Sequence, residues 1–425
     1  MKKILYLVLC LTVFLRSPLS VMAEEELPES RLHAASACLM DAASGRVLYG
    51  KAEEEPLPMA STTKIMTCIL ALEEIPDPEK TVTAASQEAA SQPEVRLGVR
   101  EGQKFYLQDL LYALMLESYN DAAVMIAEQV SGSVEAFAER MNQKAEELGC
   151  RDTHFVTPTG LDSSDAGGAH HTTAADLARI MRYCIRLSPK ADRFLEITRT
   201  SSYSFWDADQ QTIYDCVNHN AFLNMMEGAL SGKTGFTNQA GYCYVGAVEQ
   251  GDRCLIVSLL ACGWPDNRSY KWADTRTLME YGFENYQARD VFDTAFRGKE
   301  IPVEDGRYPE FPGQGAAYVT ADLNLPEEER SLPLLLGKEE TVEVRYDLPE
   351  SLQAPVKEGE QVGKVSYCLQ GQILAEYPLY AVSAVERADY FWCLGRLWNW
   401  YGCRESLKKI GKLCQRFGQL SFFVI

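Results

Sequence analysis

Ser61 and Lys64 could together perform nucleophilic chemistry. They lie three positions apart at the start of a segment whose apolar residues recur with helical period, which predicts a buried helix: Ile65, Met66, Ile69, Leu70 and Leu72. Positions i and i+3 share one face of a helix, so the Ser61 hydroxyl and the Lys64 amine would lie side by side. A serine nucleophile needs such a neighbouring base to take its proton. This pair alone leaves open a second interpretation, a serine at a helix start beside a surface lysine.

Two further motifs carry groups that would complete such a site. Ser118-Tyr119-Asn120 lies between two segments, 107–116 and 122–130, whose apolar periodicity predicts helices. Lys233-Thr234-Gly235 lies in a segment rich in Gly and Thr, 228–242, which leads into two predicted strands. A second hydroxyl and an amide can relay a proton and hold a substrate. A cation and a hydroxyl can hold a carboxylate, and backbone N–H groups can stabilise an oxyanion.

The order of the three motifs is typical of β-lactamases and penicillin-binding proteins. The chain resembles the low-molecular-mass penicillin-binding proteins of the D-alanyl-D-alanine carboxypeptidase family, peptidase family S11. The resemblance extends from about residue 34 to the carboxyl-terminal tail. It rests on PMASTTKIMT, ESYNDAA, HFVTPTGLD and GALSGKTGFTNQAGYCYV. Two positions depart from the common pattern: Thr157 replaces a frequent Asn, and Tyr119 replaces a frequent Gly.

The resemblance implies a role for each catalytic residue. Ser61 would form an acyl-enzyme, Lys64 would activate it, and Ser118 and Asn120 would line the cleft. The activity implied is removal of the terminal D-Ala from peptidoglycan pentapeptide stems, with inhibition by β-lactam antibiotics. No cofactor and no metal are implied.

The resemblance also implies how the substrate is held. Lys233 and Thr234, with Gly235 completing their motif, would bind the terminal carboxylate. The backbone N–H groups of Ser61 and Phe236 would form the oxyanion hole. The family often adds an Arg before the last helix of the domain, and both Arg268 and Lys271 lie in that segment.

Composition and periodicity predict the organisation of the chain. Residues 24–287 are expected to form an α/β (α+β) catalytic domain of the serine DD-peptidase/β-lactamase type, with an antiparallel sheet flanked by helices. Pro, Gly and period-two alternation, as in Thr341–Tyr346, predict a small all-β, sandwich-like domain over 288–385. Residues 386–425 are expected to form an amphipathic helix.

The two ends of the chain predict export and attachment to a membrane. Lys2 and Lys3 before an apolar run, with small residues up to Ala23, indicate a signal peptide over 1–23. In the tail, tryptophans and a basic helix face are typical of a helix in a membrane surface, or alternatively of a helix docked on the protein. The location expected is the extracytoplasmic face of the bacterial cytoplasmic membrane. The formal net charge of −19 argues against nucleic acid as a partner.

Cysteines and histidines show no metal-ligand spacing. The thirteen cysteines are scattered without a CxxC pair, so most are expected to be buried small hydrophobes. The five histidines form no HExxH motif, and His170-His171 lies in a Gly-rich loop.

Two alternative functions remain. A β-lactamase would need a further Glu base, for which Glu146 and Glu147 do not complete the pattern, and a non-catalytic penicillin-sensing or wall-binding module would not need the reactive residues.

Overall fold

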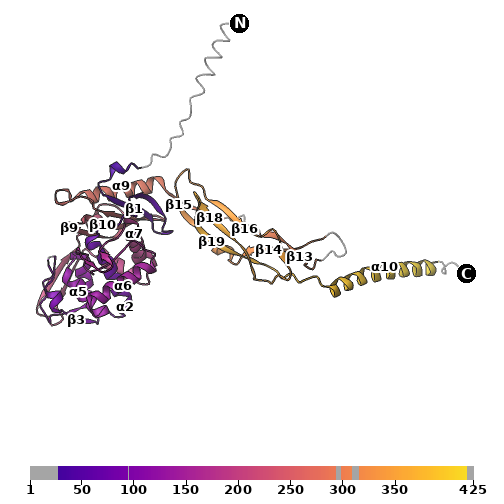
Figure 1. The fold of residues 1–425 in the computed structure, drawn as a ribbon, viewed down its shortest axis with the longest axis horizontal. Coiled ribbons are helices and arrows are strands. Elements are labelled where there is room, and N and C mark those ends of the chain that lie inside the picture. The colour runs from indigo at the N-terminus through magenta and orange to yellow at the C-terminus, as the bar shows by residue number, and fades with distance from the viewer. Residues whose placement is uncertain (1–26, 94, 293–297, 309–314, 419–425) are drawn as a thin grey trace, which may run out of the picture. The chain divides into compact units, whose positions relative to one another are not determined.

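The chain divides into two compact units. The computed structural model describes residues 27–93, 95–292, 298–308 and 315–418 (Figure 1). The first unit comprises the chain up to Ala288 together with Leu334–Lys338, and the second comprises Arg289–Pro333 and the chain from Glu339 onward. The return of Leu334–Lys338 to the first unit was not predicted. The predicted signal peptide, 1–23, lies outside the described residues.

A five-stranded antiparallel sheet forms the centre of the first unit. The order is β2-β1-β11-β10-β9. The amino-terminal hairpin, β1 (Ser36–Asp41) and β2 (Val47–Lys51), pairs with β11 (Arg253–Leu260) rather than with a neighbour in sequence. β10 (Gly241–Gln250) connects β11 to β9 (Ala229–Thr237), which is the edge strand. The predicted antiparallel sheet is confirmed.

Both faces of this sheet are buried. Along β11, Leu255, Val257 and Leu259 pack in one apolar cluster with α9 (Tyr270–Asn285). The alternate residues Cys254 and Ile256 pack in a second cluster with α2, α5 and α7. Successive side chains of a strand point to opposite faces, so a strand covered on both sides is apolar throughout. Figure 1 shows α9 on one side of the sheet and the remaining helices on the other.

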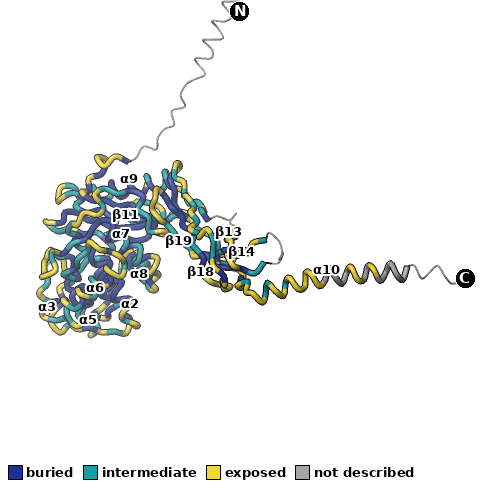
Figure 2. The backbone as a smooth tube through the Cα atoms, turned by 45° about the vertical axis from the view of Figure 1, so that its right-hand side comes forward, coloured by how far each residue is buried: buried dark blue, intermediate teal, exposed yellow. Residues whose placement is uncertain are grey.

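The larger helical region positions the first motif. It contains α2 (Lys64–Glu74), α3 (Gln87–Ala90), α4 (Leu107–Tyr112), α5 (Asn120–Ser131), α6 (Val134–Glu147), α7 (Ala174–Arg182) and α8 (Ala191–Arg199). α2 is buried from Lys64 to Leu72, which confirms the predicted buried helix (Figure 2). Ser61 itself lies in a preceding 3₁₀ turn, Ala60–Thr63. Short hairpins flank these helices: β3 (Val82–Ala84) with β4 (Lys104–Tyr106), β5 (Ser164–Asp165) with β6 (Gly168–Ala169), and β7 (Ser202–Trp206) with β8 (Ile213–Val217).

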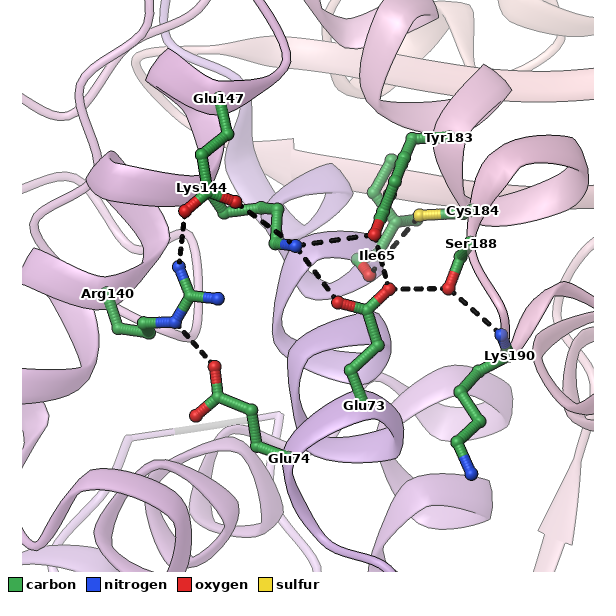
Figure 3. A network of polar contacts seen from close by, with 10 residues as sticks. All are labelled: Ile65, Glu73, Glu74, Arg140, Lys144, Glu147, Tyr183, Cys184, Ser188 and Lys190. Atoms are coloured by element: carbon green, nitrogen blue, oxygen red, sulfur yellow. Dashed lines mark hydrogen bonds and ion pairs between the residues drawn. The ribbon is translucent and has the colours of Figure 1, made fainter.

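A largely buried polar cluster fixes the carboxyl end of α2 (Figure 3). The Glu73 carboxylate lies 3.0 Å from Lys144 Nζ of α6. It also accepts hydrogen bonds from Tyr183 Oη at 2.6 Å and Ser188 Oγ at 2.5 Å. The two charged side chains are only 11% and 9% exposed, so each needs the other as a partner. The cluster therefore ties the helix that begins at Lys64 to its neighbours at its far end.

The second unit is built on a six-stranded sheet. Its order is β16-β18-β19-β14-β13-β17. The strands are β13 (Lys299–Glu304), β14 (Ala317–Leu323), β16 (Glu343–Asp347), β17 (Leu352–Gln353), β18 (Gln361–Leu369) and β19 (Gln372–Ala381). β12 (Gln287–Asp290) and β15 (Pro333–Leu336) form a separate two-stranded ribbon, and most of β15 belongs to the first unit. The predicted small all-β domain is confirmed.

The tail forms one long helix, α10 (Tyr390–Gly418). Its first turn begins at Asp389, whose carboxylate accepts the N–H of Trp392 at 2.8 Å. Tyr390, Phe391 and Trp398 are 73%, 79% and 79% exposed. Of the predicted apolar face, the side chains at Leu407, Ile410, Leu413, Cys414, Phe417 and Leu420 lie outside the described residues. Among the helices that the structure describes, none is long and apolar enough to cross a membrane.

Candidate active site

Ser61 and Lys64 meet at the start of α2. The Lys64 amine lies 3.0 Å from Ser61 Oγ. Ser61 is partly exposed at the end of a cleft, whereas Lys64 is fully buried behind it. The i, i+3 spacing therefore produces the contact that the sequence predicted, although the pair spans the junction of a 3₁₀ turn and an α-helix.

The surroundings of Lys64 favour the neutral form of its amine. Besides Ser61, its Nζ contacts Asn120 Oδ1 at 2.9 Å and the Thr159 carbonyl oxygen at 2.6 Å. Burial, and then the charge of Lys233, hold the pKa of Lys64 well below its usual value. A neutral amine has two N–H groups and one lone pair. Since the amide and carbonyl oxygens can only accept, they take the two N–H groups and leave the lone pair for the Ser61 hydroxyl.

Ser118 is held in a strained conformation. It follows a π-helical turn, Ala113–Glu117, and has a φ of 67°, in the left-handed region. Its Oγ accepts a hydrogen bond of 2.9 Å from Lys233 Nζ. Burial lowers the pKa of Lys233 to about 7. Backbone strain in a non-glycine residue persists only where surrounding contacts fix it, and such positions concentrate at functional sites.

The edge strand β9 turns the backbone N–H of Phe236 toward the same site. Phe236 is opposite Tyr242 of β10, but the N–H and C=O of Tyr242 bond to Gly263 and Cys262, on the other side of β10. In an antiparallel ladder the N–H and C=O of one residue point to the same side. Phe236 is therefore in a non-hydrogen-bonded pair, and its N–H points to the open edge. A Cβ on Gly235 would lie 2.9 Å from the Ser61 nitrogen, so only glycine lets the strand approach this closely.

The motifs converge on one cleft of about 580 Å³. Ser61, Ser118, the segment Lys233–Phe236, Arg268 and Lys271 line it. Lys64 and Asn120 lie behind it, joined to Ser61 through the hydrogen bonds above. Tyr119 is not among the lining residues; its side chain packs against the apolar core of the first unit. All nine residues predicted for the site therefore lie at this cleft or directly behind it.

Arg268 and Lys271 differ in their environment. Arg268 is exposed at the cleft. Lys271 is 7% exposed, and its Nζ donates to the Arg268 carbonyl at 2.8 Å. The same Nζ lies 4.4 Å from the ring centre of Tyr242 and 4.8 Å from that of Trp272. Burial lowers the pKa of Lys271. Lys271 thus holds the backbone of the segment that carries Arg268.

Two contributors to the site were not predicted as site residues. Thr159 contributes through its backbone carbonyl, which no residue type signals. His170 contacts the nucleophile turn through Thr63, with 2.8 Å between Nε2 and Oγ1. Its only sequence signal was a histidine in a Gly-rich loop.

Nine of the ten cysteines with described environments are buried and all ten are free thiols, in agreement with the prediction for most of them.

The fold and the cleft define a serine enzyme of the penicillin-binding type. The chain belongs to peptidase family S11, described as D-alanyl-D-alanine carboxypeptidase, whose sequence model matches residues 21–262. A second family model, described as the C-terminal domain of penicillin-binding protein 5, matches residues 324–387. The predicted resemblance is confirmed, and neither the β-lactamase nor the non-catalytic alternative gains support.

Relatives cover both units. D-alanyl-D-alanine carboxypeptidase DacF of Bacillus subtilis is 26% identical over 370 residues, covering 85% of this chain and 88% of that protein. D-alanyl-D-alanine carboxypeptidase DacB2 of Mycobacterium tuberculosis is 36% identical over 57% of this chain and 80% of its own length. The crystal structure of penicillin-binding protein 5 from Haemophilus influenzae superimposes with a TM-score of 0.65 at 25% identity, covering 85% of this chain and 99% of that one.

Proposed function

We propose that the protein removes the terminal D-Ala of peptidoglycan pentapeptide stems through an acyl-enzyme on Ser61. The observation that carries the proposal is the set of contacts around Lys64. Its two N–H groups are taken by Asn120 and Thr159, and its lone pair faces Ser61 Oγ at 3.0 Å. This arrangement activates a serine at neutral pH without a histidine.

The geometry supports the following acylation step. Ser61 Oγ attacks the carbonyl carbon of the penultimate D-Ala, and its proton passes to Lys64 Nζ. The N–H groups of Ser61 and Phe236 stabilise the oxyanion. The C–N bond then breaks as the leaving D-Ala amine receives the proton that Lys64 had accepted, relayed through the Ser118 hydroxyl, which Lys233 contacts at 2.9 Å. Lys64 is then neutral again and takes a proton from the water that attacks the ester. That proton returns to Ser61 Oγ as the shortened stem leaves.

The positive end of the cleft would bind the terminal carboxylate. Lys233 and Thr234 supply a cation and a hydroxyl beside the nucleophile. Arg268 is the better candidate for the additional cation, because its side chain is exposed at the cleft whereas Lys271 is committed to the Arg268 carbonyl and two aromatic rings. A penicillin carries a carboxylate and a reactive amide at similar positions, which makes it an inhibitor that acylates the same serine.

We also propose that the enzyme is exported and lies at the outer face of the cytoplasmic membrane. Exposed aromatic side chains at the start of α10 and exposed Lys408, Lys409 and Lys412 support attachment through this helix. Cell-wall stems are substrates at that surface.

Labelling with penicillin tests the nucleophile and the class together. The purified chain is incubated with a fluorescent penicillin and, separately, with a peptide ending in D-Ala-D-Ala. We expect one covalent adduct, located on Ser61 by mass spectrometry, and release of D-Ala; Ser61→Ala should abolish both. Absence of both reactions in the wild-type chain would refute the proposal. Rapid penicillin turnover without D-Ala release would indicate a β-lactamase.

A further inference from the structure

His170 is a buried histidine beside the catalytic residues that the mechanism does not use. It is 4% exposed and directly follows β6, in a loop that the sequence presented only as Gly-rich. Its ring has a polar partner at each nitrogen. Nε2 lies 2.8 Å from Thr63 Oγ1, and Nδ1 lies 3.0 Å from the Val156 nitrogen.

One arrangement of hydrogens satisfies all of these contacts. The Thr63 hydroxyl donates to the Ala60 carbonyl at 2.9 Å, so it accepts from His170. The backbone N–H of Val156 can only donate, so Nδ1 carries no proton. His170 is therefore the neutral tautomer with its proton on Nε2. Burial, and then the neighbouring His154, His171 and Lys64, lower its pKa to about 3, which agrees with a neutral ring at physiological pH.

The two partners of His170 belong to the two segments that set the position of Lys64. Thr63 is in the turn that carries Ser61, next to Ala60, whose φ of 48° is strained. Val156 begins the loop that leads to Thr159, whose carbonyl accepts from Lys64 at 2.6 Å. The two segments touch tightly, since a Cβ on Gly160 would lie 1.9 Å from the Ala60 carbonyl oxygen.

We propose that His170 is a positioning residue for the catalytic serine and lysine. Through Thr63 it fixes the strained turn before Ser61, and through Val156 it fixes the loop that supplies the Thr159 carbonyl. The distances from Lys64 to Ser61 and to Thr159 are then set by one side chain, the His170 ring, which joins the two segments. This inference rests on the proposed function, because it concerns the rate at which Ser61 is acylated.

A double-mutant cycle tests the bridge. His170→Asn keeps an acceptor near Val156 but is too short to reach Thr63, and Thr63→Val removes the hydroxyl from the other side. We expect each to slow penicillin acylation of Ser61 by about tenfold or more, with the non-covalent affinity for penicillin nearly unchanged. The double variant should be no slower than the slower single variant, because both remove the same contact. Rates are expressed per folded molecule, from the fraction folded in thermal unfolding.

The neighbouring histidine provides a matched control. His171→Asn makes the same substitution one residue away, at a ring whose contact is the Ala169 carbonyl, and it should acylate at the wild-type rate. Variants of His170 and Thr63 that acylate as fast as wild type, or whose effects multiply, would overturn the inference while leaving the proposed function intact. A wild-type chain that penicillin does not label would overturn both.

Discussion

At the scale of single residues, the proposed mechanism requires two buried lysines in opposite protonation states. Lys64 must be neutral to accept the Ser61 proton, and Lys233 must be charged to attract a carboxylate. Burial lowers the pKa of both amines. Lys64 is lowered further because Lys233 repels its charge, so a proton on Lys233 helps to keep Lys64 deprotonated.

This pairing predicts a bell-shaped pH profile. In kcat/KM for a D-Ala-D-Ala peptide, activity should rise on the acid side as Lys64 loses its proton. It should fall on the alkaline side with an apparent pKa of about 7, as Lys233 loses its own. The profile of kcat should extend to higher pH, because a bound carboxylate favours the charged form of Lys233.

Substitution of Lys233 tests whether its deprotonation causes the alkaline fall in activity. Lys233→Arg keeps the charge at all these pH values, so any remaining activity should lose the alkaline fall while keeping the acid rise. An alkaline limb unchanged in Lys233→Arg would assign that limb to another group.

At the scale of elements, the Ser118 turn is held by the last residue of β8 and by the residues that follow it. The Glu117 carboxylate accepts the Val217 N–H at 2.6 Å and lies 2.7 Å from His219 Nε2. The His219 N–H bonds to the Leu116 carbonyl at 3.3 Å. These contacts fix the end of the π-helical turn immediately before the left-handed Ser118 and thereby maintain its bond to Lys233.

Removing the carboxylate should loosen the turn. Glu117→Ala is expected to lower the penicillin acylation rate by about tenfold, because Ser118 Oγ loses its fixed position. Glu117→Gln retains an acceptor for Val217 and should recover most of the rate. Stopped-flow acylation measures both, with the exposed Glu139→Ala of α6 as control. Equal loss in the Ala and Gln variants would show that charge, and not the contact to Val217, is what matters.

The periodicity of apolar residues in the sequence predicted the helices and strands better than it predicted the local geometry of the site. The apolar period over 122–130 corresponds to α5, and the two strands predicted after 228–242 correspond to β10 and β11. The 3₁₀ turn at Ser61 and the π-helical turn before Ser118 depend on tertiary contacts. The spacing of apolar residues does not reveal such contacts, so it predicted ordinary α-helix at both places. α8 and the β7–β8 hairpin were not predicted as elements, and the strands of that hairpin each bury only one residue, which weakens the alternation.

The site was predicted by motif, and its supporting contacts were not. Ser61, Ser118 and Lys233 lie in recognisable patterns, whereas Thr159 acts through a carbonyl and His170 through a tautomer that only its neighbours determine. Tyr119 occupies the middle position of the motif, but its partly buried side chain packs against the apolar core. Such contacts depend on which segments meet in space, and the order of residues does not specify that.

At the scale of the whole molecule, the change of composition near residue 288 predicted a second unit, but the return of Leu334–Lys338 to the first was not predicted. Leu335 packs in the apolar cluster around α9, and its carbonyl accepts from Arg46 at 2.6 Å. Leu334, Leu335 and Leu336 are all buried, and a short run of buried leucines carries no signal that distinguishes the two cores.

Deletion of 389–425 should release the enzyme from membranes without loss of peptide hydrolysis. None of the described residues of the tail lines the cleft. The deletion removes the contact of Arg307 with Asp389, but the contacts of Arg307 with Glu386 and of the Ala388 N–H with the Asp305 carbonyl precede the cut. Each exposed lysine near an anionic surface contributes about 1 kcal/mol of attraction.

Sedimentation with vesicles containing anionic lipid measures this attachment. The full chain should sediment with them, less so as salt is raised, and the truncated chain should stay in solution. Unchanged sedimentation after truncation would refute the anchor. Loss of D-Ala release would show that the tail also supports the catalytic unit.

The open edge of β9 leaves the catalytic sheet one strand short. An extended peptide lying along Lys233–Phe236 would complete the ladder with main-chain bonds that are the same for every sequence. Discrimination between stems must therefore come from side chains on the two faces of the added strand. The same open edge could pair with any other extended chain, so a second copy of this chain bound along β9 would block the substrate.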